Sequence, residues 1–200
     1  MCWSAEVSLA SFAFATLGLL VGLYTNFNWR ILLIGYVFSF MQFVEYNLWN
    51  NLKNPAGNRF WSMMGDATIW GEILASINLL TNPLQRNTMF GLAGLHFVLS
   101  ELLFPGKREF KTTVGPTGHL SHDWFPNTPL ARLNAAFIIL PFWMQGYTSF
   151  AWFVTLTFLY SAYMYHSKGE FSSMWCFFAL GFWFLVIYQG IMNKKKSVHL

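Results

Sequence analysis

The chain has 200 residues, of which 55% are hydrophobic, 20% aromatic and only 10% charged. Soluble domains carry about 25% charged residues, so this composition excludes an ordinary soluble domain and is typical of an integral membrane protein. The net charge of +4 comes from 12 basic and 8 acidic residues. The basic residues lie between apolar segments or in the tail Lys194, Lys195 and Lys196, which fits anionic lipid headgroups. We therefore expect membrane lipids as partners and no nucleic acid.

Seven apolar segments follow one another, most of them long enough to cross a bilayer about 30 Å thick as a helix. They predict helices at residues 5–24, 29–49, 60–81, 89–104, 130–145, 149–166 and 172–192. Capping residues precede several of them, namely Asn28, Thr88, Thr128 followed by Pro129, Ser149, and Ser172 or Ser173. Lipid offers the backbone no hydrogen-bond partners, and the segments lack the alternation of barrel strands. The sequence therefore predicts an all-α fold, a single transmembrane bundle over residues 1–200 with about seven spans.

One long connection, residues 105–129, is too polar to cross a membrane. With seven crossings, this connection lies on the same side as the N-terminus, together with the loops after the second and sixth segments. Basic residues divide seven to five in favour of that side. Because cytoplasmic loops carry an excess of Lys and Arg, this division favours a cytoplasmic N-terminal side.

The positions of the acidic residues are the most informative feature. Of the eight, Glu45, Asp66, Glu72 and Glu101 fall inside predicted membrane helices, and Glu6 lies in the first turn of the first helix. An ionised carboxylate at mid-bilayer costs about 2.5–3.5 kcal/mol, so these acids must be protonated, hydrated, bound to a cation or metal, or shared as neutral hydrogen-bond donors between helices. For a single acid, a neutral hydrogen-bond donor between helices is the preferable interpretation. Four acids favour a functional polar interior.

Helical spacing places several of these groups on common helix faces. The shared faces are formed by Ser39, Gln42, Glu45 and Trp49, by Thr68, Glu72 and Ser76, and by His96 with Ser100. Glu101 points away from the face of His96. We expect the acid and base groups of an active site to be Glu45, Asp66, Glu101 and His96, and the substrate site to be lined by Gln42, Trp49, Glu72 and Glu6.

The long connection holds a candidate metal site at His119, His122 and Asp123. Their spacing can place two imidazoles and a carboxylate around a divalent metal if the connection folds back over the bundle. Exposed or structurally bonded histidines are the plainer alternative. Cys2 and Cys176 fall on the same side of the membrane and are candidates for a disulfide, a thiolate metal site or lipid attachment, with two inert packed thiols as the default.

Four segments carry a resemblance to a known family. They are the opening MCWSAEVS (Met1–Ser8), MQFVEYNLW (Met41–Trp49), Gly118-His119-Leu120 and Ser173-Met174-Trp175-Cys176. In these segments the chain resembles small polytopic membrane proteins of uncharacterised function that occur in large DNA viruses of algae and protists and in some of their hosts. The resemblance covers most of the chain and implies a polytopic membrane protein, but it implies no reaction and no ligand.

The leading functional hypothesis is a membrane-embedded enzyme, with or without a bound divalent metal, that acts on a lipid-like substrate. Glu45, Asp66 or Glu101 would serve as general acid or base, and His119 or His122 as metal ligand or second base. One alternative is a proton or cation channel or transporter, which would need polar residues at both faces of the membrane. The other is a structural membrane or virion scaffold protein whose acids are hydrogen-bonded between helices.

Overall fold

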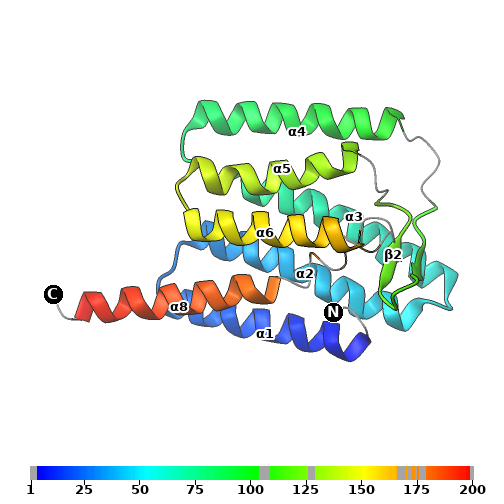
Figure 1. Cartoon of the computed structure of the whole chain (residues 1–200), viewed down its shortest axis with the longest axis horizontal. Helices are drawn as coiled ribbons and strands as arrows, with labels where there is room; N and C mark the ends of the chain where they lie inside the picture. Colours follow the sequence, from blue (N-terminus) through cyan, green and yellow to red (C-terminus); the bar gives the residue numbers. More distant parts are fainter. Residues whose placement is uncertain are drawn as a thin grey trace.

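The computed structural model describes residues 4–103, 109–125, 129–165, 170, 173, 175 and 179–198. Within these residues seven helices run along one long axis: α1 (Ala5–Tyr24), α2 (Trp29–Asn51), α3 (Pro55–Ile77), α4 (Pro83–Leu103), α5 (Pro129–Met144), α6 (Thr148–Tyr165) and α8 (Ala179–Val198) (Figure 1). Two short strands, β1 (Thr112–Val114) and β2 (Leu120–His122), lie across one end. The predominance of helix confirms the helical part of the predicted fold class.

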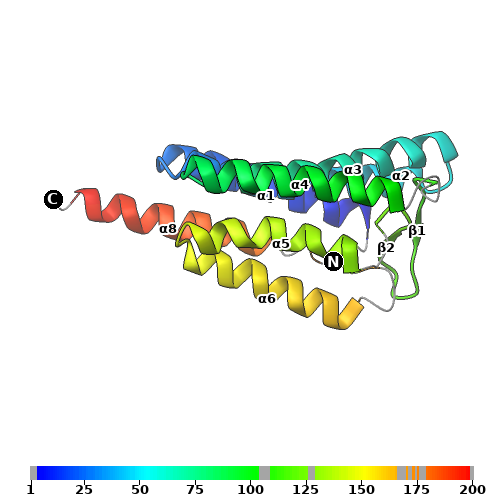
Figure 2. The same cartoon turned by 90° about the horizontal axis from the view of Figure 1, so that it is seen from above.

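The helices form two layers. Helices α1 to α4 lie side by side in chain order in one layer, and α5, α6 and α8 form the other (Figure 1, Figure 2). Between the layers α5 packs on α3, and α8 packs on α1 and α2. The start of α1, the turn between α2 and α3, and the two strands lie at one end of the bundle, which we call the hairpin end (Figure 1). The loops that follow α1, α3 and α5 lie at the opposite end, the far end.

Local capping explains where the second and third helices begin. Asn28 caps α2, as predicted, and its side chain accepts a 3.0 Å hydrogen bond from the backbone N–H of Arg30. The third helix begins at Pro55, five residues before the predicted start, because Asn54 caps it and proline suits the first helical position. The apolar segment used for the prediction starts only after this polar first turn.

The later helix starts also differ from the prediction. The fourth helix begins at Pro83 rather than at 89, because the Asn82 side chain accepts from the backbone N–H groups of Leu84 and Gln85. The predicted cap Thr88 therefore lies inside α4. The sixth helix includes Ser149 and begins at Thr148. The predicted caps Thr128 and Ser172 lie outside the described residues.

Within the part of the chain that the structure describes, two helices, α1 and α2, are long and apolar enough to cross a membrane. Only 28% of the apolar span in α1 is buried, so α1 is not a core helix of the usual kind. Its buried residues are small or polar and form one stripe: Ser8, Ser11, Ala15, Gly18 and Gly22. Its exposed residues include Leu9, Leu17, Leu20 and Leu23. The expectation of about seven spans is thus supported by length and composition for two of the helices.

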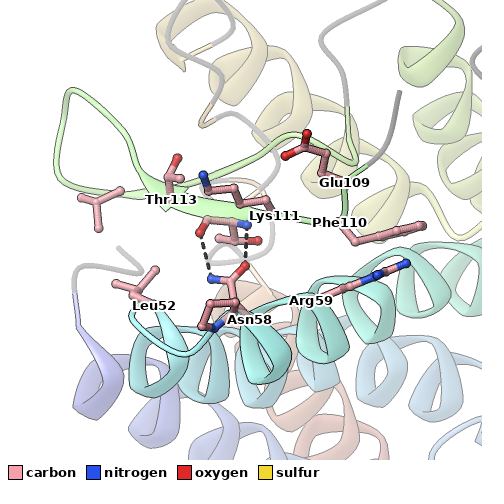
Figure 3. A pocket seen from close by; sticks show the side chains of 10 residues that line it. Leu52, Asn58, Arg59, Glu109, Phe110, Lys111 and Thr113 are labelled. Atoms are coloured by element: carbon pink, nitrogen blue, oxygen red, sulfur yellow. Dashed lines mark hydrogen bonds between the residues drawn. The ribbon is translucent and has the colours of Figure 1, made fainter. Parts of the chain in front are cut away.

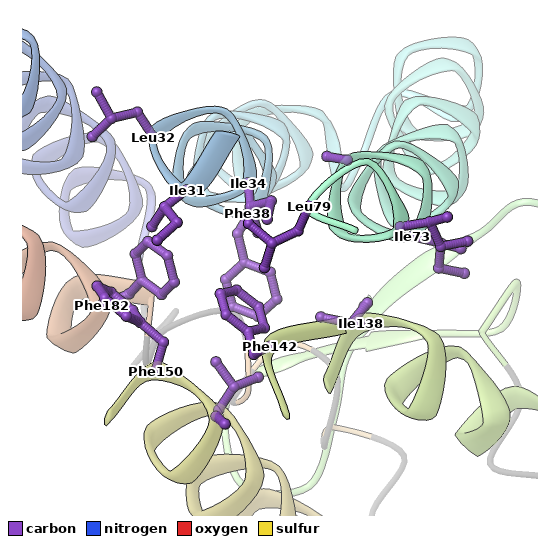
Figure 4. Packing of buried hydrophobic residues seen from close by; sticks show 14 of the residues in the cluster. Ile31, Leu32, Ile34, Phe38, Ile73, Leu79, Ile138, Phe142, Phe150 and Phe182 are labelled. Atoms are coloured by element: carbon purple, nitrogen blue, oxygen red, sulfur yellow. The ribbon is translucent and has the colours of Figure 1, made fainter. Parts of the chain in front are cut away.

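The core divides into two hydrophobic clusters. The larger fills the far half of the bundle with aliphatic and aromatic side chains from both layers, including Ile31, Ile34, Phe38, Ile138, Phe142, Phe150 and Phe182 (Figure 4). The smaller lies at the hairpin end and consists of Met41, Val44, Leu48, Ile69, Leu120 and Trp124. Because Leu120 and Trp124 come from the long connection, this second cluster fixes that connection to α2 and α3.

The connection between α4 and α5, expected only as a polar loop, forms an antiparallel β-hairpin. Thr112 pairs with His122, Thr113 with Ser121 and Val114 with Leu120. Gly118 in the turn has φ +83°, a left-handed conformation that favours glycine. The strand pairing sets Thr112 and His122 opposite each other, and both are buried against the bundle.

Candidate functional site

A carboxyl group and an imidazole face each other at the hairpin end. Nε2 of His122 in β2 lies 3.8 Å from Oε1 of Glu45 in α2, and both side chains are completely buried. The second oxygen of Glu45 accepts a 3.3 Å hydrogen bond from Nε2 of Gln42, one helical turn earlier. Ser39, Gln42 and Glu45 are all buried, as their shared helix face predicted, whereas Trp49 is half-buried.

The Thr112 hydroxyl lies at the centre of a buried hydrogen-bond network beside this pair. It is 3.0 Å from Nδ1 of His122 and 2.8 Å from the hydroxyl oxygen of Ser62. It also accepts a 3.1 Å hydrogen bond from the indole N–H of Trp124. A single hydroxyl therefore joins the imidazole to α3 and to the chain that follows the hairpin.

The backbone of Thr112 is held by Asn58 in α3. The Asn58 amide donates to the carbonyl oxygen of Thr112, and its amide oxygen accepts from the Thr112 N–H, each at 2.9 Å (Figure 3). The amide thus occupies the edge of β1 as a neighbouring strand would, so both polar groups of Thr112 that face α3 are satisfied.

An open cavity of about 520 Å³ lies between β1 and the first turns of α3 (Figure 3). Asn58 and Thr112 belong to its wall. Charged groups come from Arg59, Lys111 and Glu109, and apolar surface from Leu52, Phe110 and Val114. Phe110 has φ +49°, a conformation that is rare for a bulky residue and that concentrates at functional sites.

A second carboxyl group lies deeper in the bundle. Glu72 of α3 is buried on the same helix face as Thr68 and Ser76, as their spacing predicted. Its side chain interacts electrostatically with Glu45. Among the described residues, Oε1 of Glu72 has no hydrogen-bond partner. The buried polar groups therefore extend from the hairpin end toward the middle of the bundle.

The other predicted acid and base groups differ in their burial. Asp66 is half-buried on α3, on a different face from Glu72, and Glu101 is exposed on α4 rather than inside the bundle. Glu6 is exposed in the first turn of α1, where an acidic side chain interacts favourably with the helix dipole. His96 is buried, but its Nε2 lies 2.7 Å from Oδ1 of Asn134, so it joins α4 to α5.

The predicted metal site is not assembled. His122 ends β2, whereas His119 lies in the bend before that strand, and the two imidazoles have different neighbours. His119 packs edge-on against Tyr165, with ring centroids 5.7 Å apart, whereas His122 faces Glu45. Within the described part of the chain, no three His, Cys, Asp or Glu side chains form a group that could hold a metal ion. Cys2 and Cys176 lie outside the described residues.

Asp123, the third member of the predicted metal site, is exposed and serves the hairpin instead. Its Oδ1 accepts a 2.7 Å hydrogen bond from the backbone N–H of Lys111. Partial burial raises the pKa of the Asp123 carboxyl, and this hydrogen bond opposes the rise. The carboxylate closes the open end of the hairpin next to the pair of Thr112 and His122.

Several residues of the site were not identified from the sequence. Asn58 and Ser62 are four residues apart in α3, so a helix start at Pro55 would have shown that they share a face. Glu170, assigned to a loop, is completely buried and accepts hydrogen bonds from the backbone N–H of Thr117, at 2.9 Å, and from the Thr117 hydroxyl. An isolated acid between small and aromatic residues gives no local signal of such a role.

No protein-family model, no curated protein and no solved structure matches the chain. The site itself therefore carries the functional proposal.

Proposed function

We propose that the chain is an integral membrane protein whose helices lie in the bilayer with the hairpin at one leaflet. The surface of the bundle supports this proposal. A soluble protein buries most of its large apolar side chains, whereas α1 exposes Leu9, Leu17, Leu20 and Leu23 and buries only Ser, Ala and Gly. Helix α4 likewise exposes large side chains, among them Leu92, Leu95, Phe97, Val98 and Leu99. Continuous apolar surface of this kind fits lipid as the solvent.

Within that membrane protein, Glu45 and His122 form an acid–base site for a lipid-like substrate. The observation that carries the proposal is the position of Thr112, which belongs to the wall of the open cavity and also bonds the imidazole that faces Glu45. A carboxyl group and an imidazole that face each other can exchange a proton with a third group. The acid–base pair is thus separated from the cavity by Thr112.

The cavity indicates the class of substrate. Its volume of about 520 Å³ lies within the range of about 300–1,000 Å³ that is usual for small-molecule sites. Arg59 and Lys111 suit an anionic headgroup, and Leu52, Phe110 and Val114 suit an apolar chain. We therefore take an anionic, amphipathic lipid as the substrate class.

Access to the pair requires movement of the hairpin. Both Glu45 and His122 are completely buried, and the two hydrogen bonds between Asn58 and Thr112 separate them from the cavity. Opening these two bonds would move β1 away from α3 and bring a bound lipid to the imidazole. The hairpin then acts as a cover that excludes water from the acid–base site in the closed state.

The test uses purified protein reconstituted into phosphatidylcholine vesicles with and without phosphatidylglycerol. Lipid composition is followed by mass spectrometry for the wild type, Glu45→Gln and Glu101→Gln. We expect conversion of lipid by the wild type and by Glu101→Gln, because the structure places Glu101 outside the buried cluster, and loss of conversion in Glu45→Gln. Conversion that persists in Glu45→Gln would remove this residue from the mechanism, and a wild type that converts and binds neither lipid would favour the scaffold alternative.

A proton pathway is the second candidate, because Glu72 lies deeper in the bundle and interacts electrostatically with Glu45. The packing in the far half of the bundle argues against a proton pathway. There the space between the layers is filled by side chains such as Ile31, Phe142 and Phe182, a packed apolar barrier (Figure 4). Vesicles with an internal pH dye separate the two functions: a proton flux that Glu72→Gln abolishes would establish the pathway, and its absence in the wild type would favour the one-sided site.

A further inference from the structure

The hydrogen-bond network around Thr112 decides which nitrogen of His122 carries the proton. A hydroxyl has one hydrogen to donate and two lone pairs that accept. Thr112 has three partners, namely Trp124, Ser62 and His122. It must therefore accept from two of them and donate to the third, and the identity of the third fixes the tautomer of the imidazole.

The first hydrogen bond that the Thr112 hydroxyl accepts comes from Trp124. An indole N–H can only donate, so the 3.1 Å contact between Nε1 of Trp124 and Oγ1 of Thr112 occupies one lone pair of the hydroxyl. The indole is held in this position by packing, because Trp124 is completely buried in the cluster with Met41 and Leu120.

The second hydrogen bond that the Thr112 hydroxyl accepts comes from Ser62. This side chain is completely buried, and its contact with Thr112, at 2.8 Å, is the one hydrogen bond of its hydroxyl among the described residues. If Thr112 donated to Ser62, the hydrogen of Ser62 would be left without an acceptor in a buried position, which is costly. Ser62 therefore donates, and both lone pairs of Thr112 are occupied.

We infer that Thr112 donates its hydrogen to Nδ1 of His122 and thereby holds the imidazole as the Nε2–H tautomer, with the proton on the nitrogen that faces Glu45. The contact of 3.0 Å between the hydroxyl and Nδ1 is the bond that remains for this hydrogen. The opposite tautomer would set a nitrogen lone pair against a carboxylate oxygen 3.8 Å away, and the two would repel. Only in the first arrangement do the hydrogens of Trp124, Ser62 and Thr112 all have acceptors; the Nε2–H of His122 then points toward Oε1 of Glu45, which at 3.8 Å lies beyond hydrogen-bonding distance.

This inference gives Thr112 and Glu45 distinct roles at the proposed site, and its catalytic meaning rests on the proposed function. Thr112 is a positioning residue, because it sets the proton of His122 without reaching the substrate through its hydroxyl. Glu45 is the carboxylate toward which that proton points, with Gln42 donating to its other oxygen. The pair can then take up a proton at Glu45 while the imidazole keeps its orientation.

Nitrogen NMR of protein labelled with ¹⁵N-histidine in lipid vesicles tests the tautomer directly. The chain has five histidines, and His122→Gln identifies the signals of His122 by their loss. We expect a neutral ring with the hydrogen on Nε2 in the wild type and in Thr112→Ser, which keeps the hydroxyl. Thr112→Val should lose this single tautomer, while Thr113→Val, an exposed neighbour on the same strand, should keep it.

An Nδ1–H ring or an imidazolium at His122 in the wild type at neutral pH would overturn the inference, and the one variant that this measurement requires is His122→Gln, for the assignment. An unchanged Nε2–H signal in folded Thr112→Val would also overturn the role of Thr112. The outcome is independent of lipid conversion. An Nε2–H ring in a protein whose conversion does not depend on Glu45 would leave the tautomer established and refute the proposed function.

Discussion

Gly65 of α3 leaves the space that the Trp124 indole fills. A Cβ atom at position 65 would lie 2.6 Å from Cη2 and 2.7 Å from Cζ2 of that ring, closer than packed atoms approach. The indole is completely buried and donates its N–H to Thr112. Because Gly65 has no side chain, Trp124 can pack closely against α3, and this packing sets the position of the Thr112 hydroxyl.

Gly65→Ala should destabilise the protein. The added methyl group must displace a buried ring, and overpacking of this kind costs about 1–3 kcal/mol, against a gain of up to about 1 kcal/mol in helix propensity. Gly94→Ala is the matched control, since its Cβ would meet nothing within 4 Å. Unfolding in detergent should show lower stability for Gly65→Ala and equal or higher stability for Gly94→Ala. Equal stability of the two variants would show that the indole is free to shift.

Asn58→Ala should loosen the hairpin. The change leaves the buried N–H and C=O of Thr112 without the partners that the Asn58 amide supplies, and each unsatisfied group costs about 1–3 kcal/mol. Hydrogen exchange followed by mass spectrometry should show faster exchange in the segment 109–122. Asn50→Ala removes only an exposed bond to the carbonyl oxygen of Tyr46 and should leave exchange there unchanged. Slow exchange in both variants would mean that the hydrophobic cluster alone holds the hairpin.

Helix faces were predictable from the sequence because they depend on local spacing. The buried stripe of Gln42 and Glu45 and the exposure of Glu101 relative to His96 follow from 3.6 residues per turn. The burial of a side chain was less predictable than its helix face. The apolar segment around Glu101 belongs to α4, which the layer of α5, α6 and α8 barely covers. A carboxyl group in an apolar segment is buried only where another element packs over it.

The partner of Glu45 could not be predicted. His122 belongs to a hairpin whose docking depends on Trp124, Gly65 and Asn58, contacts that join distant parts of the chain. The spacing of His119 and His122 was interpreted as metal binding because the connection was expected to be a loop. The hairpin overturns that interpretation, because it places His119 against Tyr165 and His122 against Glu45.

Asp123→Asn should change how stability depends on pH. Burial raises the folded-state pKa of this carboxyl above its ordinary value of 3.8, so between these two values the folded state binds more protons than the unfolded state. The contribution of Asp123 to stability therefore falls as pH rises through that window and is constant above it. Asparagine does not titrate and still accepts from the Lys111 N–H, so the variant should be more stable than the wild type at pH 7, by less than about 1 kcal/mol because the side chain is exposed.

Melting temperatures of the two proteins between pH 3 and pH 7 provide the measurement. The difference between them should shrink as the pH is lowered below the ordinary pKa of aspartate. A less stable Asp123→Asn at neutral pH would show that the charge on the acceptor of the Lys111 hydrogen bond outweighs the cost of burial.

The contact between Thr117 and Glu170 should hold the turn of the hairpin against the segment that follows α6. Glu170 is completely buried and accepts from both the N–H and the hydroxyl of Thr117. Thr117→Val preserves the shape of the side chain and removes one donor to a buried carboxyl group. Because a buried acceptor that loses its partner costs about 1–3 kcal/mol, we expect a loss of stability of that order and faster hydrogen exchange in the turn.

Two further variants decide whether that loss comes from the contact itself. Thr113→Val makes the same change at an exposed position of β1 and should alter stability by less than about 0.5 kcal/mol. Gly115→Ala leaves Thr117 intact but would set a Cβ against Oε1 of Glu170, so it should loosen the same turn by displacing the carboxyl group. Faster exchange in Thr117→Val and Gly115→Ala, with Thr113→Val unchanged, is the expected pattern. Equal effects of both threonine variants would mean that the hydroxyl of Thr117 contributes nothing specific and that Glu170 is held by its other contacts.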